Sequence, residues 1–312
     1  MSDGVDRTPD PTSSQMEPNR GSVEDGWFYE EDQGQTRFGI RIAEHLHSER
    51  SDWQKIDVYR SDFHGHVLTL DDLVMLTSRD EFVYHEMLVH VPLCAIENPR
   101  DVLIIGGGDC GCIREALRHD TVRRVVQCEI DERVTRVSED YYPWVKSTIA
   151  DPRVELVFDD GVKFIERNKA SFDLIIIDST DPIGPAVGLF LADFYSRVAA
   201  ALKPGGVMAA QTEAPFWYPV ELGKIHGQMR EAFRHVEHYW GTIPTYPSGS
   251  WTWAFASNDR GPQDHLDVRR VEAIERGTRY WNRGVHRACF ELPNFVKLAI
   301  AGQDPFGDLS GQ

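Results

Sequence analysis

Downstream of Pro99, short apolar runs alternate with longer stretches in which apolar and polar residues are mixed. The apolar runs are rich in β-branched residues, which is typical of strands buried on both faces. They predict strands at 102–105, 125–128, 154–158, 174–178 and 207–210. The mixed stretches predict helices at 113–119, 131–142, 161–169 and 190–202. This alternation predicts an α/β fold with a doubly wound parallel sheet.

The chain on either side of this region has a different pattern. Short extended pieces between residues 27 and 76 predict a small antiparallel β domain, and helical spacing predicts a connecting helix at 81–94. A helix near 219–233 and a late hairpin of 235–240 with 251–256 complete the prediction. We therefore expect a disordered tail at 1–24, an N-terminal β domain at 25–85, a larger α/β domain at 86–303 and a C-terminal tail at 304–312.

Charge and cysteine content narrow the classes of partner. The 312 residues carry a net charge of −17, which argues against nucleic acid or an anionic membrane as the main partner and suits a cationic substrate. No apolar run reaches the ~20 residues that a bilayer crossing needs. An odd number of cysteines, five, without a signal peptide predicts reduced thiols and a cytoplasmic protein.

A glycine loop follows the first strand of the predicted parallel sheet. The run 106–111 has the G-x-G-x-x-G spacing between a strand and a helix, and Glu129 lies 21 positions after Gly108. This pattern is typical of nicotinamide coenzymes, but Asp109 disfavours them. At ~4 Å and an effective dielectric near 20, its carboxylate would cost about 4 kcal/mol against each pyrophosphate charge. S-adenosylmethionine and its relatives, with a ribose, a sulfonium and an ammonium but no phosphate, fit better.

Acidic residues end three of the predicted strands. Glu129 and Asp160 follow the strands at 125–128 and 154–158, and Asp178 is the last residue of the strand at 174–178. The carboxyl ends of parallel strands open into the crevice where α/β sheets bind ligands, and a carboxylate there can hold a cation or remove its proton. Acidic residues also end strands as helix N-caps, so this second interpretation stays open.

These residues, together with several longer strings, resemble the spermidine synthases, that is, the polyamine aminopropyltransferases. The strings are RDEFVYHEM at 79–87, IIGGGD at 104–109, CEID at 128–131, DSTDPIGP at 178–185 and IPTYPSG at 243–249. The resemblance covers about residues 27–301. It implies a small N-terminal β domain, a Rossmann-like domain of the methyltransferase type, and a homodimer or homotetramer.

The resemblance also implies a reaction. Decarboxylated S-adenosylmethionine, a co-substrate rather than a cofactor, gives its aminopropyl group to a small diamine, usually putrescine, and the products are spermidine and methylthioadenosine. No metal is expected, because a sulfonium is already a good leaving group.

Individual residues take roles from the same comparison. The positions that correspond to donor-binding residues are Gln54, His85, Asp109, Glu129, Asp160 and Gly161. Among them Glu129 resembles the ribose ligand, Asp160 the adenine contact and Asp109 the ligand of the terminal amine. Asp178 resembles the base that takes the proton of the attacking amine. Residues 179–188 resemble a gate over the site. The catalytic set is Asp178, Tyr84 and Asp181, and the diamine-binding set is Tyr84, Asp181, Gln211, Tyr246 and Trp251.

The chain departs from the family's pattern at two positions. Cys110 stands where the family usually has a second glycine, and Met75 stands where many relatives have glutamine. Cys110 and Cys112 lie at a helix start, where a thiol pKa can be lowered, so redox sensitivity is one interpretation. Three other functions stay open: an aminopropyltransferase acting on agmatine, cadaverine or spermidine, an amine N-methyltransferase using S-adenosylmethionine, and a non-catalytic polyamine-binding protein.

Overall fold

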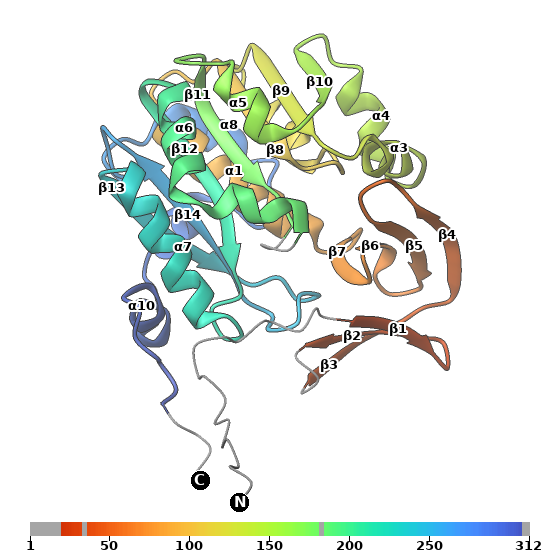
Figure 1. Cartoon of the computed structure of the whole chain (residues 1–312). Coiled ribbons are helices and arrows are strands. Elements are labelled where there is room, and N and C mark those ends of the chain that lie inside the picture. The colour runs from red at the N-terminus through yellow and green to blue at the C-terminus, as the bar shows by residue number, and fades with distance from the viewer. Residues whose placement is uncertain (1–19, 33–35, 181–183, 308–312) are drawn as a thin grey trace, which may run out of the picture.

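The computed structural model of the protein describes residues 20–32, 36–180 and 184–307 (Figure 1). A seven-stranded mixed sheet forms its centre, in the order β10-β9-β8-β11-β12-β14-β13. The first five of these strands run parallel to one another, and β14 pairs antiparallel with its neighbours β12 and β13. Their bounds are β8 Asp101–Gly106, β9 Arg124–Glu129, β10 Val154–Phe158, β11 Phe172–Asp178, β12 Leu202–Glu213, β13 His235–Gly241 and β14 Trp251–Ser257.

Helices cover both faces of this sheet (Figure 1). Alternate residues of one strand point to opposite faces, so Ile104 packs in one core cluster and Ile105 in the other. This double burial explains why each strand is a continuous apolar run rather than an alternating one. The helices are α1 Glu81–Ala95, α2 Gly111–Ala116, α3 Glu132–Tyr141, α4 Pro143–Ile149, α5 Gly161–Glu166, α6 Ala192–Ala201, α7 Pro219–Ala232, α8 Val268–Glu275, α9 Arg283–Ala288 and α10 Asn294–Ile300, with a 3₁₀ segment at Gly184–Phe190.

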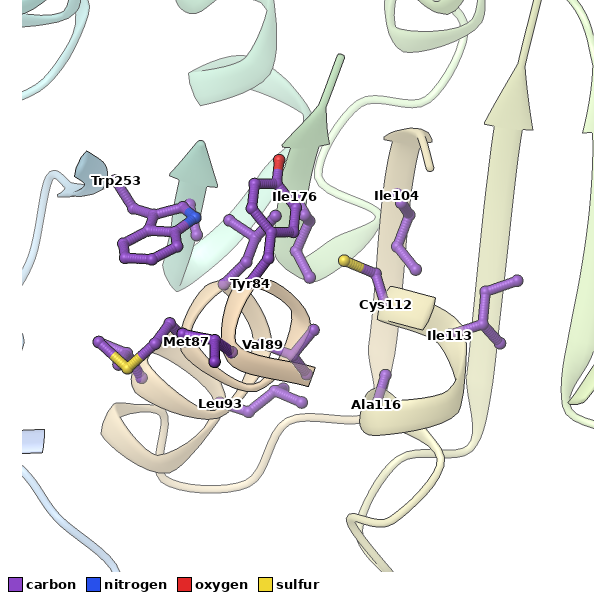
Figure 2. Packing of buried hydrophobic residues seen from close by; sticks show 14 of the residues in the cluster. Tyr84, Met87, Val89, Leu93, Ile104, Cys112, Ile113, Ala116, Ile176 and Trp253 are labelled. Atoms are coloured by element: carbon purple, nitrogen blue, oxygen red, sulfur yellow. The ribbon is translucent and has the colours of Figure 1, made fainter. Parts of the chain in front are cut away.

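Helix α1 connects the N-terminal sheets to the central sheet and lies in the core itself. Figure 2 shows its residues Met87, Val89 and Leu93 among the side chains of one core cluster, beside α2 and the sheet. Fourteen of the helix's residues are buried, including His85 and Glu86. The carboxylate of Glu86 accepts the backbone N–H groups of residues 279–281, which ties the C-terminal region to this helix.

Two small antiparallel sheets precede α1. One has the order β1-β2-β3 and the other β4-β5-β6-β7. Their bounds are β1 Arg20–Glu24, β2 Trp27–Asp32, β3 Thr36–Arg41, β4 Glu44–Arg50, β5 Lys55–Ser61, β6 Gly65–Leu70 and β7 Leu73–Thr77. Phe28 of the first sheet and Tyr59 of the second belong to one buried cluster, so the two sheets share a core.

The predicted α/β sheet, its N-terminal antiparallel region and the late hairpin are confirmed, and three details are wrong. Arg20–Glu24, which was predicted to belong to a disordered tail at 1–24, forms β1 by pairing with β2. The rest of that predicted tail, and residues 308–312 of the predicted C-terminal tail, lie outside the described residues. Strand β12 begins at Leu202, before the turn from which it was expected to start. A separate helix, α4, follows α3, and Pro143 begins it. None of the helices in the described residues has the length and apolar character that a bilayer crossing requires.

Candidate active site

A cavity of about 450 Å³ lies at the carboxyl ends of the parallel strands. The ends of β8, β9 and β11 contribute Gly106, Glu129 and Asp178 to its wall. All six positions predicted to bind the donor line it: Gln54, His85, Asp109, Glu129, Asp160 and Gly161. The structure therefore brings together, in one space, residues that lie as far apart in the chain as Gln54 and Gly161.

The glycine loop lets the chain pass close to the end of β11. Gly106 has a φ of +84°, and a Cβ there would lie 2.1 Å from the carbonyl oxygen of Asp178. The next residue, Gly107, donates its backbone N–H to that same carbonyl at 2.9 Å. The loop thus holds the backbone of Asp178 in place, and only glycine fits at position 106.

We expect Gly106→Ala to destabilise the protein by about 2–5 kcal/mol, because a left-handed φ and an overpacked contact both have to be accommodated. Gly227→Ala is the matched control. Gly227 lies in α7 with no atom within 4 Å of its would-be Cβ, and the same change there stabilises by up to ~1 kcal/mol. Denaturant unfolding of both variants checks this, and equal stabilities would contradict the role given to the loop.

Asp178 is held by two protic donors. The Tyr84 hydroxyl donates to Oδ1 at 2.7 Å, and the Cys112 thiol donates to Oδ2 at 3.1 Å. Burial, together with the nearby negative charge of Asp109, raises the pKa of Asp178 above its ordinary value. A carboxylate with a raised pKa is a stronger proton acceptor, as a general base requires.

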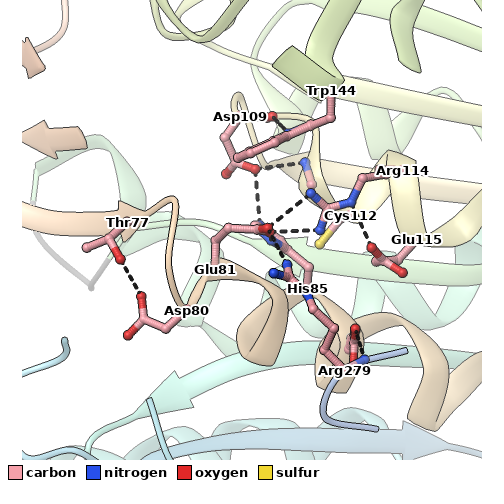
Figure 3. Close-up of polar contacts among 12 residues, drawn as sticks. Thr77, Asp80, Glu81, His85, Asp109, Cys112, Arg114, Glu115, Trp144 and Arg279 are labelled. Atoms are coloured by element: carbon pink, nitrogen blue, oxygen red, sulfur yellow. Dashed lines mark hydrogen bonds and ion pairs between the residues drawn. The ribbon is translucent and has the colours of Figure 1, made fainter. Parts of the chain in front are cut away.

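Asp109 belongs to a chain of alternating charges with His85, Glu81, Arg114 and Glu115 (Figure 3), and the first three of these five residues line the cavity. The ring of His85 lies between two carboxylates, with Nδ1 at 2.8 Å from Glu81 and Nε2 at 3.1 Å from Asp109. Arg114 donates to Glu81 at 2.7 Å and also to Glu115 at 2.7 Å. Each buried charge in the chain therefore has an opposite charge beside it.

This chain of charges sets the protonation of its members. Burial alone would lower the pKa of His85, but Asp109 and Glu81 outweigh it and raise that pKa to about 10. Burial alone would raise the pKa of Asp109, but the His85 imidazolium and the Gly111 N–H keep it below its ordinary value. Near neutral pH the site thus holds an ionised Asp109 and a charged His85.

The other predicted donor ligands have partners of their own. Glu129 accepts the N–H of Asp131 at 2.9 Å, and burial raises its pKa to about 7. Asp160 caps α5 by accepting the N–H of Val162 at 2.8 Å, so it serves as an N-cap as well as lining the cavity. The side chain of Gln54 donates to Asp131 at 2.9 Å.

A second, smaller cavity of about 70 Å³ adjoins the first. Tyr84 and Tyr246 line both, and Gln211 and Trp251 line only the smaller one. The Tyr246 ring packs edge-on against Trp251, with ring centroids 4.8 Å apart. Four of the five residues predicted to bind the diamine therefore line this cavity. The fifth, Asp181, and part of the predicted gate at 179–188 lie outside the described residues.

The interpretation of the thiols as acidic is wrong, and their contacts had not been foreseen. Burial, followed by the charges of Asp178 and Asp109, raises the pKa of Cys112 well above its ordinary value, and burial also raises the pKa of Cys110. Cys110 adopts a left-handed φ of +61° at the start of α2, in the place of the usual glycine. The contact of Cys112 with Asp178 joins residues 66 positions apart, and no local pattern indicates it.

Comparison with known proteins agrees with this geometry. A sequence model described as the spermine/spermidine synthase domain matches residues 81–266, and one described as the spermidine synthase tetramerisation domain matches 26–78. The chain belongs to the spermidine synthase family. The predicted resemblance is thereby confirmed, and with it the family's class of enzyme, the polyamine aminopropyltransferases.

Individual members of the family are similar over nearly their whole length. A polyamine aminopropyltransferase of Thermoanaerobacter sp. (strain X514) is 44% identical over 87% of this chain and 97% of its own. A polyamine aminopropyltransferase of Clostridium perfringens (strain 13 / Type A) is 41% identical over 89% of this chain and 99% of its own. A spermidine synthase crystallised with the transition-state analogue AdoDATO has a TM-score of 0.86 at 37% identity and covers 93% of this chain and 98% of its own. The crystal structure of the spermidine synthase of Thermotoga maritima has a TM-score of 0.85 at 37% identity and covers 95% of this chain and 99% of its own.

Proposed function

We propose that this chain transfers the aminopropyl group of decarboxylated S-adenosylmethionine to putrescine, giving spermidine and methylthioadenosine. The observation that carries the proposal is the position of Asp178. It lies in the wall of the larger cavity and is hydrogen-bonded to Tyr84, which lines both cavities. A base in that position stands between a bound donor and a bound acceptor.

The donor occupies the larger cavity. Its ribose hydroxyls donate to Glu129, its adenine lies towards Asp160, and its terminal ammonium pairs with Asp109. A complex of a similar spermidine synthase with the analogue AdoDATO supports this choice of ligand. The cavity wall carries seven carboxyl side chains and no lysine or arginine among its described residues, so it favours a cation over a phosphorylated coenzyme.

The acceptor enters the smaller cavity, where Gln211, Tyr246 and Trp251 surround it. An alkyl ammonium titrates near ~10.4 and has no lone pair, so the attacking nitrogen must first lose a proton. Asp178 accepts that proton. The nitrogen then forms a bond to the methylene carbon beside sulfur while the carbon–sulfur bond breaks, and the electron pair stays on the sulfur of methylthioadenosine. Holding the three atoms in line contributes ~7–11 kcal/mol.

The acceptor is tested by supplying the purified protein with the decarboxylated donor and putrescine, cadaverine, agmatine or spermidine in turn. We expect putrescine to give the highest kcat/KM. A higher value for another amine would assign a different aminopropyltransferase activity to this chain. The N-methyltransferase alternative is tested by supplying intact S-adenosylmethionine, from which we expect no methylated amine.

Donor binding is expected to depend on pH through Glu129. Its pKa of about 7 means that the carboxylate is half protonated near neutrality, and only the ionised form accepts two ribose hydroxyls and attracts a cation. The association constant of the donor should rise as pH increases from 6 to 8 and then level off. Calorimetry at several pH values checks this, with Glu129→Gln as the variant in which the rise is expected to flatten.

The 26–78 match to a tetramerisation domain supports an oligomer, and we propose a homotetramer. Sedimentation analysis at several protein concentrations tests that assembly, and a monomer at all of them would exclude it.

A further inference from the structure

Three side chains with different ligand atoms converge beside the glycine loop. His85 comes from α1, Cys112 from α2 and Asp178 from the end of β11. One ligand atom from each residue, a nitrogen, a sulfur and an oxygen, lies within 4.8 Å of the other two. Cysteine, histidine and aspartate are the ligands that Zn²⁺ and similar thiophilic ions prefer.

We propose that His85, Cys112 and Asp178 form an inhibitory site for a thiophilic divalent cation such as Zn²⁺ or Cd²⁺. Zinc bonds of about 2.0–2.3 Å in a tetrahedral site place ligand atoms ~3.5 Å apart. The thiol and the carboxylate are already 3.1 Å apart. The three ligand atoms now lie within 4.8 Å of one another. A shift of at most about 1.3 Å between the imidazole and this pair therefore brings all three to the spacing that the ion needs.

The histidine already has the partner that a metal ligand needs. Its Nδ1 faces Glu81 at 2.8 Å, which leaves Nε2 for an ion. A carboxylate on the far nitrogen fixes the ring of a metal-binding histidine and raises its basicity. Nε2 now lies 3.1 Å from Asp109, so the ion displaces the proton on Nε2, and the nearby carboxylate of Asp109 offsets the ion's charge.

The acidic wall of the larger cavity attracts cations, and the cavity gives them access to the site. Cys112 is fully buried, whereas His85 and Asp178 line the larger cavity, so an ion arrives from that side. Among the described lining residues His85 is the only side chain that can carry positive charge. Coordination deprotonates the thiol and the imidazolium, and both protons pass to solvent as the two metal–ligand bonds form.

Binding of the ion does not depend on the proposed function, whereas inhibition does. An ion bonded to Asp178 occupies the carboxylate that we assign as the base, and it adds positive charge where the sulfonium would lie. Ion binding is therefore measured without substrates, and inhibition is measured separately as a loss of turnover.

Ion binding is measured with Co²⁺ added to the purified full-length protein without substrates. We expect a near-ultraviolet thiolate-to-cobalt band in the unmodified protein and in Cys110→Ala, the matched control at the start of the same helix. The band should be lost in Cys112→Val and in Cys112→Ser, whose hydroxyl still donates to Asp178. A band of equal strength in the Cys112 variants, or none in the unmodified protein, would overturn the site.

Inhibition is measured as aminopropyl transfer in buffered Zn²⁺, with each variant compared with its own rate in EDTA. We expect at least tenfold inhibition of the unmodified protein and of Cys110→Ala, reversed by EDTA, and less than twofold for Cys112→Ser. Equal inhibition of Cys112→Ser would overturn the inhibitory role. Absence of transfer in EDTA would contradict the proposed function instead and would leave the cobalt result standing.

Discussion

Asp178→Asn is expected to lower kcat by ~10²–10⁴-fold, the range in which a positioned general base contributes. The amide has nearly the shape of the carboxylate and can still accept the Tyr84 hydroxyl, but it cannot take a proton from an ammonium. Donor binding, which the proposal gives to Glu129, Asp160 and Asp109, should stay within a few-fold. Steady-state kinetics and donor calorimetry on the same preparation separate the two effects.

The matched control for this variant is Asp159→Asn. Asp159 follows β10 at the same edge of the sheet, but its side chain pairs with Arg167 at the surface. Its kcat should change by less than about twofold, as for most surface substitutions. If Asp178→Asn keeps a normal kcat, the base must be another residue. If it loses donor affinity and kcat together, Asp178 is a binding residue.

Asp109→Asn is expected to weaken donor binding by about 30-fold or more, because truncating one partner of a buried charge pair costs ~2–5 kcal/mol. The donor's ammonium loses its counter-charge, and the imidazolium of His85 keeps only Glu81. The preference for the decarboxylated donor over intact S-adenosylmethionine should also shrink, since the carboxylate of the intact donor no longer meets a like charge.

Competition calorimetry with the two donors measures both effects. Asp71→Asn is the control, since Asp71 lines the same cavity but is largely exposed. We expect it to change donor affinity by less than threefold. An Asp109→Asn protein that binds the decarboxylated donor normally would refute the assignment of Asp109 to the terminal amine.

The strands of the central sheet could be predicted because their signal is local. Val102, Leu103, Ile104 and Ile105 form an unbroken apolar run, which is typical of a strand covered on both faces. Polar residues that interrupt or end such runs, among them Glu129 and Asp178, then fall at the edge where ligands bind. Four of the seven acidic residues that line the larger cavity lie at this edge: Asp109, Glu129, Asp160 and Asp178.

The parts that could not be predicted depend on pairing between distant segments. Strand β1 has little apolar content, and it is held in place by its antiparallel pairing with β2. The link from Glu81 to Arg114 spans 33 positions. The raised pKa of His85 depends on two carboxylates, Glu81 and Asp109, that come from different parts of the chain and pack against the same ring. A helix start suggests an acidic thiol, but the pKa of Cys112 is raised because the site around it is dry and negative.

We propose that the carboxylates of this cavity recognise a sulfonium donor and that Asp178 activates an amine to attack it. The most direct test is mass spectrometry of the products after incubation with decarboxylated S-adenosylmethionine and putrescine. We expect spermidine and methylthioadenosine in equal amounts, and neither in the Asp178→Asn reaction on the same timescale. Unchanged substrates after many hours with the unmodified, folded protein would contradict it.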